Sequence, residues 1–218
     1  MIKNFERTIR VANINEEGRL GGPQMRMALV ASALAKSEFN KKIDITFIFP
    51  KEDSKEFRER CDAIGIKYFL FSFTKISRNW INILKYLILF PFEVMKLANF
   101  LKKHSFDIVH ASGGSQQFKG IIAAKIAKIK VVWEMNDTYA PFVFRNMYFL
   151  LSRLVNCLVF GSNRTKEYYK NITPKNKKNF LIHSPVNVNF YDPLFNFPIE
   201  EFIKRNIGQR LICLWSPS

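Results

Sequence analysis

The stretch TIRVANINEEGRLGGPQMRMALVASALAK, residues 8–36, joins an apolar run to a helical segment through a loop with two adjacent glycines. Val, Ile and Ala dominate the run at 8–14, and residues typical of helices follow Pro23. Proline suits the first helical position because its missing N–H would have no intrahelical acceptor there. The stretch therefore predicts a strand, a tight loop and a helix in succession.

Gly21 and Gly22 in this loop predict an anion site. Glycine adopts positive φ without strain and lets backbone N–H groups approach a ligand closely. A helix N-terminus adds partial positive charge, so a phosphate is the ligand expected at this turn. The alternative is a tight turn that binds nothing, because the loop has neither the GxGxxG spacing of dinucleotide-binding loops nor the lysine of a P-loop.

Six further apolar runs follow, without sustained polar alternation, which is typical of parallel strands covered on both faces. Helix-length segments separate several of the runs, as at 23–37, 54–65 and 115–128. The alternation predicts a doubly wound, mostly parallel α/β sheet of the Rossmann-like type, with ligands at the carboxyl ends of its strands. The six runs are residues 43–49, 66–73, 106–112, 130–136, 155–162 and 179–186.

The charge of the chain is strongly positive, with 34 Lys and Arg against 18 Asp and Glu and a formal net charge of +16. This surplus indicates an anionic partner, and a phosphate, an anionic lipid surface or a nucleic acid would each satisfy it. The 3 cysteines are far apart and form no metal-binding motif, so neither a disulfide framework nor a metal site is expected. The first residues lack the apolar core of a signal peptide, which favours a cytoplasmic location.

The run at 106–112 leads into a series of small and polar residues that predicts a ligand-binding rim. The histidine of this series is suited to binding a hydroxyl or phosphate group. Two alternatives remain open: the histidine is a hydrogen-bonded core residue, and the glycines and the last serine only form a turn and cap a helix. The rim residues are His110, Ser112, Gly113, Gly114 and Ser115.

The runs at 130–136 and 155–162 also end in polar residues. Glu134, Asn136 and Asp137 are expected to face the crevice at the strand ends, where a carboxylate can act as a base or orient a sugar hydroxyl. The alternative for Asp137 is structural, the capping of the next turn. Ser162 or the asparagine after it is predicted to cap a helix with Arg164 in its first turn, where a cation is favourable only beside an anion.

Five phrases, taken in order, resemble the N-terminal, acceptor-side domain of a GT-B glycosyltransferase of the retaining family four. They are GGP at 21–23, FDIVHAS at 106–112, KVVWEMND at 130–137, CLVFGSNRTKEYY at 157–169 and LIHSPVNVNFYDP at 181–193. The resemblance implies one half of a GT-B enzyme that transfers a sugar, with retention, from a nucleotide-sugar to a glycan or lipid-linked acceptor in cell-envelope polysaccharide synthesis. The nucleotide-sugar is a substrate, so no separate cofactor is implied.

The same resemblance implies roles for the candidate residues. Gly21 and Gly22 approach the donor diphosphate, the rim at 110–115 contributes to the acceptor site, and Asn136 and Asp137 lie near the transferred sugar as the catalytic pair. The family has His where this chain has Asn136, and asparagine can bind a hydroxyl but cannot titrate. Glu134, Ser162 and Arg164 are further cleft candidates.

The resemblance also implies a domain division. Residues 1–196 would form the N-terminal domain, and residues 197–218 a linker with the start of a donor-binding domain. In the family that second domain supplies most of the nucleotide-sugar site, including two glutamates in E-x7-E spacing, for which the residues after 196 are too few. We therefore expect a longer chain or a partner chain to supply the donor half, and no turnover by these 218 residues alone.

Residues 79–103 predict a basic amphipathic helix, and Glu93 is the one acidic residue between 71 and 106. Such a helix is typical of docking at an anionic membrane surface, here the cytoplasmic face of the inner membrane. Its uninterrupted apolar run, 86–92, is too short to span a bilayer. Two alternatives remain open: a helix that only covers the sheet, and a noncatalytic membrane-docking or scaffold subunit of a split glycosyltransferase.

A second basic run, residues 164–180, interleaves lysines and arginines with tyrosines. On its own this pattern is compatible with nucleic-acid phosphates and stacked bases. The chain has no recognisable nucleic-acid-binding module, so this function ranks below sugar transfer and no nucleic-acid partner is expected.

Overall fold

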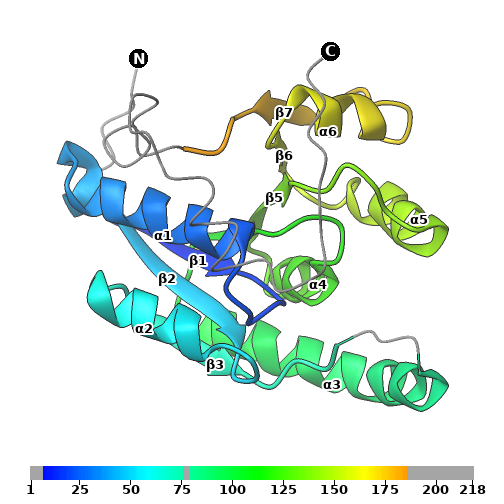
Figure 1. Ribbon diagram of the computed structural model, residues 1–218, viewed down its shortest axis with the longest axis horizontal. Helices are drawn as coiled ribbons and strands as arrows, with labels where there is room; N and C mark the ends of the chain where they lie inside the picture. Colours follow the sequence, from blue (N-terminus) through cyan, green and yellow to red (C-terminus); the bar gives the residue numbers. More distant parts are fainter. Residues whose placement is uncertain (1–6, 76–78, 186–218) are drawn as a thin grey trace, which may run out of the picture. The chain divides into compact units, whose positions relative to one another are not determined.

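The computed structural model describes residues 7–75 and 79–185 (Figure 1). Every predicted apolar run overlaps a strand. The strands are β1 Ile9–Ile14, β2 Ile43–Pro50, β3 Tyr68–Phe71, β4 Ile108–Ala111, β5 Lys130–Met135, β6 Cys157–Phe160 and β7 Lys178–Leu181. The helices are α1 Gly22–Ala35, η1 Glu38–Lys41, α2 Lys55–Ala63, α3 Trp80–Lys103, α4 Phe118–Ile126, α5 Phe142–Leu151 and α6 Asn163–Tyr169. The predicted domain boundary after residue 196 lies outside the described residues.

The strands form a single parallel sheet in the order β3-β2-β1-β4-β5-β6-β7. The chain builds outward from β1 to β3, then returns through α3 to β4 and builds outward on the other side. This confirms the predicted doubly wound, Rossmann-like fold. Because all seven strands run in one direction, their carboxyl ends share one edge, and the order reverses between β1 and β4, where such sheets bind ligands.

Two apolar cores lie on the two faces of the sheet. The larger contains Trp133, Leu97 and Tyr148 and joins the strands to α3, α4, α5 and α6. The smaller lies under α1 and α2, where the rings of Phe49 and Phe57 are 4.6 Å apart. Figure 1 shows α1 and α2 on one face and α3 to α6 on the other.

Coverage of the α1 face is incomplete, which corrects the expectation that both faces are covered. Right-handed connections place α3 to α6 on the opposite face, so within residues 7–75 and 79–185 no helix covers β4 to β7 on this side. Ile108 and Val132 there are half-buried, and Phe180 is 54% exposed. The runs looked uniformly apolar because the polar His110 and Glu134 alternate with buried residues over too few positions to form a pattern.

The glycine loop differs from the prediction in its backbone. Gly21 is the N-cap of α1 in an extended conformation, φ −152°, and Pro23 follows Gly22, so proline is the second helical residue. Neither of these glycines adopts positive φ, which occurs at Gly113 and Gly114 instead. An extended N-cap leads directly into a helix, so this turn does not need the left-handed region.

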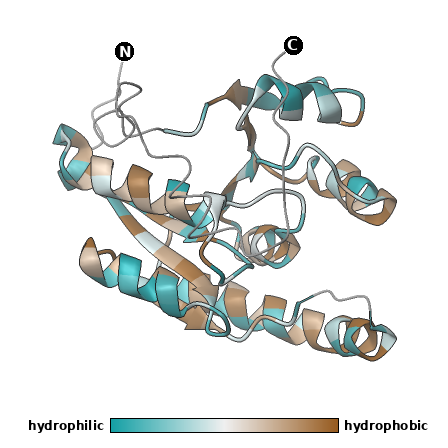
Figure 2. Ribbon diagram, viewed as in Figure 1, coloured by the Kyte–Doolittle hydropathy of each residue, from teal (hydrophilic) through white to brown (hydrophobic). Residues whose placement is uncertain are grey.

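The predicted amphipathic helix at 79–103 is confirmed as α3, with Asn79 as its N-cap. Its second half is buried against the sheet and α4 through Val94, Leu97 and Leu101, whereas Trp80 and Leu87 in its first half are exposed. Figure 2 shows apolar residues along this helix. No helix among the described residues is long and apolar enough to cross a membrane.

Candidate functional site

Polar residues gather in two groups at the carboxyl edge of the sheet. The first, here called the Glu134 network, contains Arg26, His110, Ser112, Glu134 and Asn136. The second surrounds a cavity between the loops that follow β1, β3, β4 and β5, and is here called the Asp137 cavity. The structure thus divides the predicted rim: His110 and Ser112 join the first group, and Gly113 and Ser115 the second.

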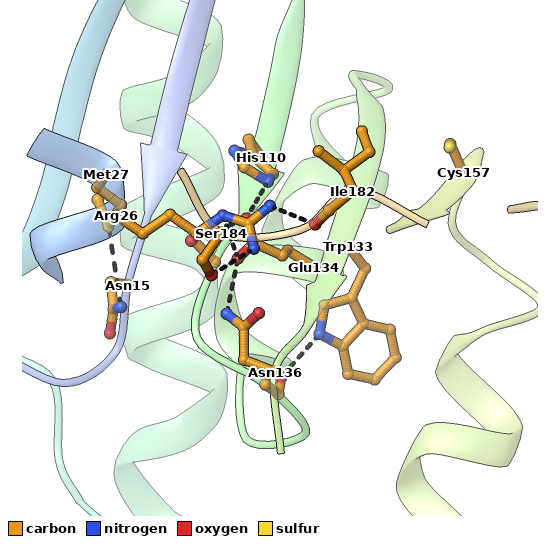
Figure 3. A network of polar contacts seen from close by, with 12 residues as sticks. Asn15, Arg26, Met27, His110, Trp133, Glu134, Asn136, Cys157, Ile182 and Ser184 are labelled. Atoms are coloured by element: carbon orange, nitrogen blue, oxygen red, sulfur yellow. Dashed lines mark hydrogen bonds and ion pairs between the residues drawn. The ribbon is translucent and has the colours of Figure 1, made fainter. Parts of the chain in front are cut away.

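Glu134 contacts four side chains, from α1, from β4 and from the loops after β4 and β5 (Figure 3). Its Oε1 accepts a hydrogen bond from Asn136 Nδ2 at 2.6 Å and lies 3.3 Å from Arg26 Nε. Its Oε2 lies 3.1 Å from His110 Nε2 and accepts a longer bond, 3.4 Å, from Ser112 Oγ. Both carboxylate oxygens are therefore occupied by protein groups.

Glu134 lines a groove on the α1 face, but its side chain is almost entirely buried in this network. Burial acts to raise its pKa, but the hydrogen bond from His110 and the charges of His110 and Arg26 act the other way, and the net result is a lowered pKa. Glu134 is thus an ionised, fully paired carboxylate. A role as a proton-accepting base does not fit this environment.

Arg26 is the partner that sequence reasoning missed. It extends from α1, is buried, and donates to Ser184 Oγ and the Ile182 carbonyl oxygen, both at 3.1 Å, beyond the end of β7. One guanidinium therefore joins α1, β5 and the segment after β7. The available indication was an arginine within the otherwise apolar helical segment MRMALVASALA, since a buried arginine needs an acidic partner.

A groove of about 350 Å³ adjoins the Glu134 network on the α1 face. His110 lies in its wall with 26% of its side chain exposed, and the remaining wall is mostly apolar, including Val30, Val132 and Ile182. His110 is thus both hydrogen-bonded within the fold and open to solvent. The alternative of a hydrogen-bonded histidine is the one the contacts support.

Asn136 lies between two strand ends. Its amide nitrogen donates to Glu134, and its Oδ1 approaches Gly161 so closely that a Cβ there would be 2.6 Å away. Ser162 caps α6 as predicted, accepting from Thr165 N at 3.1 Å, and Arg164 is exposed in the first turn. The ends of β5 and β6 therefore approach each other closely, and Gly161 leaves room for the Asn136 side chain at this contact.

Asp137 binds back to the loop after β4. Its Oδ2 accepts from Ser115 N at 3.1 Å and from Ser115 Oγ at 2.5 Å. Its Oδ1 lies over Gly114, where φ is +101° and a Cβ would be 2.8 Å from that oxygen. The alternatives that Asp137 caps the next turn and that Ser115 caps a helix are therefore not observed; the residues bind each other.

Glu16, directly after β1, performs the capping of α4 instead. Its Oε1 accepts from the backbone N–H groups of Lys119 and Gly120 at 2.7 and 3.1 Å. Burial raises the Glu16 pKa to about 7, although the charge of Lys119 and these two N–H groups act in the opposite direction. Sequence reasoning overlooked this residue, and its position at a strand end was the available indication.

Lys119 forms a buried ion pair beneath the cavity. Its side chain is fully buried, with Nζ 2.6 Å from Glu93 Oε2 on α3 and 2.5 Å from the Thr74 carbonyl oxygen. The same nitrogen lies 4.5 Å from the centre of the Tyr86 ring, a cation–π distance. The pair joins α3, α4 and the loop after β3.

The Asp137 cavity has a volume of about 380 Å³, within the range of small-molecule sites. Loops from four strand ends and one residue of α3 surround it. The lining residues are Glu16, Glu17, Thr74, Lys75, Tyr86, Gly113, Ser115, Gln116, Gln117, Asp137 and Tyr139.

The glycine loop lies at the same edge but lines neither the groove nor the cavity. Gln24 Nε2 donates to the Glu17 carbonyl oxygen at 2.9 Å, which holds the loop against α1. A Cβ placed at Gly22 would meet nothing within 4 Å, so the space beside this glycine is open. The first turn of α1 carries no acidic side chain.

The tyrosines of the basic run at 164–180 are not available for base stacking. Tyr169 is buried with its ring 4.5 Å from that of Tyr148, and the Tyr168 hydroxyl bonds the backbone of Ala140. Across residues 7–75 and 79–185, His, Cys, Asp and Glu side chains form no group of three or more suited to holding a metal ion.

Comparisons with known proteins agree with this architecture. The chain is 23% identical over 180 residues to the N,N'-diacetylbacillosaminyl-diphospho-undecaprenol alpha-1,3-N-acetylgalactosaminyltransferase of Campylobacter jejuni, covering 74% of this chain and 44% of that protein. Its fold matches Anabaena HepE in complex with UDP and glucose, with a TM-score of 0.65, 14% identity and coverage of 90% and 50%. Acinetobacter baumannii MurG gives a TM-score of 0.52, 17% identity and coverage of 78% and 44%.

The chain spans about half the length of these relatives. The solved structures show the shared fold, a parallel α/β domain that forms one half of a GT-B glycosyltransferase. The family model described as Glycosyltransferase Family 4 matches residues 20–190, which is most of the sequence. The chain therefore belongs to glycosyltransferase family 4.

Proposed function

We propose that this chain is the acceptor-side half of an enzyme that transfers a sugar, with retention, from a nucleotide-sugar to a glycan or lipid-linked acceptor. The observation that carries the proposal is the Asp137 cavity: a pocket of about 380 Å³ at the switch point of the sheet, in which Ser115 and Asp137 from neighbouring strand ends bind each other. The diphospho-undecaprenol-linked acceptor in the name of the Campylobacter relative supports a lipid-linked acceptor.

The donor half of the site is supplied by a second domain, in the same polypeptide or in a partner chain. In support, the relatives are about twice as long as this chain. Gly21 and Gly22 face that domain with their backbone N–H groups toward the donor diphosphate, where the N-terminus of α1 adds partial positive charge. Catalysis then relies on positioning and on stabilising the leaving diphosphate, without a covalent side-chain intermediate.

The residues near the transferred sugar have different tasks in this proposal. Asp137 orients a sugar hydroxyl from its place beside Ser115. Asn136 is a positioning residue, because its amide is held by Glu134 and its oxygen lies against Gly161. His110 and Ser112 act indirectly, because they hold the Glu134 side chain in place.

Transfer by the full-length enzyme tests the proposal. Purified enzyme is incubated with a panel of labelled nucleotide-sugars and lipid-linked acceptors, and product is measured for the wild type and for Asp137→Asn. We expect the variant to lose about a hundredfold in kcat, the effect of removing one preorganised group. Asp62→Asn, on the exposed surface of α2, is the matched control and keeps activity. Equal rates for Asp137→Asn and the wild type would refute the role of Asp137.

We also infer that α3 holds the protein at an anionic membrane surface, such as the cytoplasmic face of the inner membrane. Trp80, Leu87 and Phe92 are 71%, 62% and 69% exposed. The acidic residue of the helix, Glu93, is turned inward to Lys119, and Lys85 and Lys96 are exposed. The outward surface of α3 thus combines large apolar side chains with positive charge, which complements an anionic bilayer.

Flotation with lipid vesicles tests this membrane proposal. We expect binding to vesicles rich in phosphatidylglycerol and about tenfold weaker binding for Leu87→Ser, because one exposed apolar side chain no longer inserts. Phe180→Ser, exposed on β7, is the control for general loss of surface apolarity. Equal flotation of Leu87→Ser and the wild type would refute docking through α3.

A further inference from the structure

The Asp137 cavity has a charge opposite to that of the chain. Its lining contains three carboxylates, Glu16, Glu17 and Asp137, against one cation, Lys75. Lys75 is paired with both Glu17 and Asp53 at 2.9 Å, and Glu16 lies close to the charge of Lys119. The carboxylate of Asp137, also in the lining, forms no ion pair among the described residues. In a protein of net charge +16, this is a local site that disfavours anions.

The hydroxyl of Tyr86, in the same cavity, is unused by the protein. Tyr86 is 8% exposed, and its hydroxyl makes no hydrogen bond within the part of the chain that the structure describes. The ring is held in place by Lys119, whose Nζ lies 4.5 Å from its centre. The buried polar atom of the lining that has no partner among the described residues is Asp137 Oδ1. A buried polar group ordinarily has a partner, so this oxygen and the open Tyr86 hydroxyl indicate a ligand that hydrogen-bonds to them.

We infer that the Asp137 cavity binds an uncharged sugar ring of the acceptor and rejects a ring that carries a carboxylate or phosphate group. This inference rests on the proposed sugar transfer and adds the chemical class of the acceptor. Hydroxyl groups of the ring donate to the Glu16 and Asp137 carboxylates and pair with the Tyr86 hydroxyl. An anionic substituent would meet the two carboxylates at close range, and this repulsion provides the selectivity.

The geometry also places the lipid part of such an acceptor. Tyr86 belongs to α3, the helix whose outward side chains Trp80 and Leu87 are exposed. The neutral ring lies at the inner side of this helix, and the membrane surface is at its outer side. The diphosphate of the acceptor therefore lies outside the cavity.

Two methyl glycosides test the inference on the 218-residue chain. Methyl glucoside and methyl glucuronoside share one ring and differ by a carboxylate, and their binding is followed through the amide chemical shifts of Gly113 and Ser115. We expect the glucoside to bind and the glucuronoside to bind at least about tenfold more weakly, the effect of unfavourable contacts between like charges. Equal affinities, or no shift with the glucoside, would overturn the inference.

Two variants connect the selectivity to its residues. Tyr86→Phe should weaken glucoside binding about fivefold, the effect of one net hydrogen bond, whereas the matched variant Tyr68→Phe, outside the cavity, should match the wild type. Glu17→Gln removes one carboxylate from the lining while Lys75 keeps its pair with Asp53, so this variant should strengthen glucuronoside binding severalfold. Unchanged glucoside binding by Tyr86→Phe would refute the role assigned to its hydroxyl.

These results are independent of the transfer assay. If the full-length enzyme transfers sugar but its cavity does not distinguish the two glycosides, the inference of a neutral sugar ring is wrong and the proposed transferase function stands. If the cavity selects the glucoside but the enzyme transfers no sugar, the proposed transferase function is wrong and the inference of a neutral sugar ligand stands.

Discussion

The Glu134 network and the Asp137 cavity are two carboxylate-centred groups at one edge of one sheet, and they differ in how completely the protein satisfies them. Both oxygens of Glu134 contact protein donors, from Arg26, His110, Ser112 and Asn136. In the cavity, Glu16 Oε1 accepts hydrogen bonds from the N-terminus of α4, and the hydroxyl of Tyr86 has no partner among the described residues.

This difference separates a structural group from a ligand site. A saturated, buried network contributes to stability only as a whole, because the removal of one member leaves another charge unpaired. A cavity with unused polar groups has capacity for a ligand. Of the predicted catalytic pair, Asn136 belongs to the saturated group and Asp137 to the cavity. The open capacity of the cavity also involves Glu16 and Tyr86, which the sequence did not single out.

The largest effect is expected from Glu134→Ala. The variant leaves Arg26 buried without its carboxylate, so we expect the free energy of unfolding to fall by about 3–5 kcal/mol. Urea unfolding followed by circular dichroism measures this change. If Glu134→Ala costs under about 1 kcal/mol, the network is not the structural group described here.

A double variant sharpens the same test. Arg26→Met with Glu134→Leu removes both charges together, so no buried charge remains unpaired. We expect it to be more stable than Glu134→Ala alone. A double variant as unstable as the single one would show that packing, and not the unpaired guanidinium, accounts for the loss.

A smaller effect is expected from Gly114→Ala. Its φ of +101° and the 2.8 Å approach to Asp137 Oδ1 both oppose a Cβ, so we expect a loss of about 1–3 kcal/mol in the free energy of unfolding. Gly22→Ala is the matched control, because a Cβ there meets nothing within 4 Å and φ is not positive. We expect little change in its stability and, in the full-length enzyme, a higher KM for the donor. Equal stability of the two variants would contradict the assigned contact.

The sequence predicts the fold well because each strand is a local apolar run and each crossover a local helical one. The sequence also predicts that Gly113, Ser115 and Asp137 lie at one edge of the sheet, because the carboxyl ends of parallel strands share that edge. It could not predict that Glu134 pairs with Arg26, because that contact depends on how α1 turns over the sheet. Lys119 is a similar case: it lies in an apolar helix, and its partner, Glu93, comes from a different helix.

The smallest expected effect is a difference in how Glu16 and Glu134 make the free energy of unfolding depend on pH. Burial raises the Glu16 pKa above 4.5 to about 7, so the protonated form favours the folded state. This contribution is complete below pH 4.5 and is lost as the pH rises through about 7. Glu134 has a lowered pKa, so its contribution is present above its unfolded value of 4.5 and is lost as the pH falls through the folded value. The two carboxylates therefore give stability opposite dependences on pH.

Glu16→Gln isolates the first of these dependences. The amide remains uncharged and still accepts from the N–H groups of α4, so it resembles the protonated carboxyl at every pH. We expect its stability relative to the wild type to rise by about 1 kcal/mol between pH 5 and pH 8, since one pKa unit corresponds to about 1.4 kcal/mol and solvent screens a half-buried carboxylate. Urea unfolding across this range measures the difference. A constant difference would mean that Glu16 is as well satisfied as Glu134, and the contrast between the network and the cavity would then rest on Tyr86 alone.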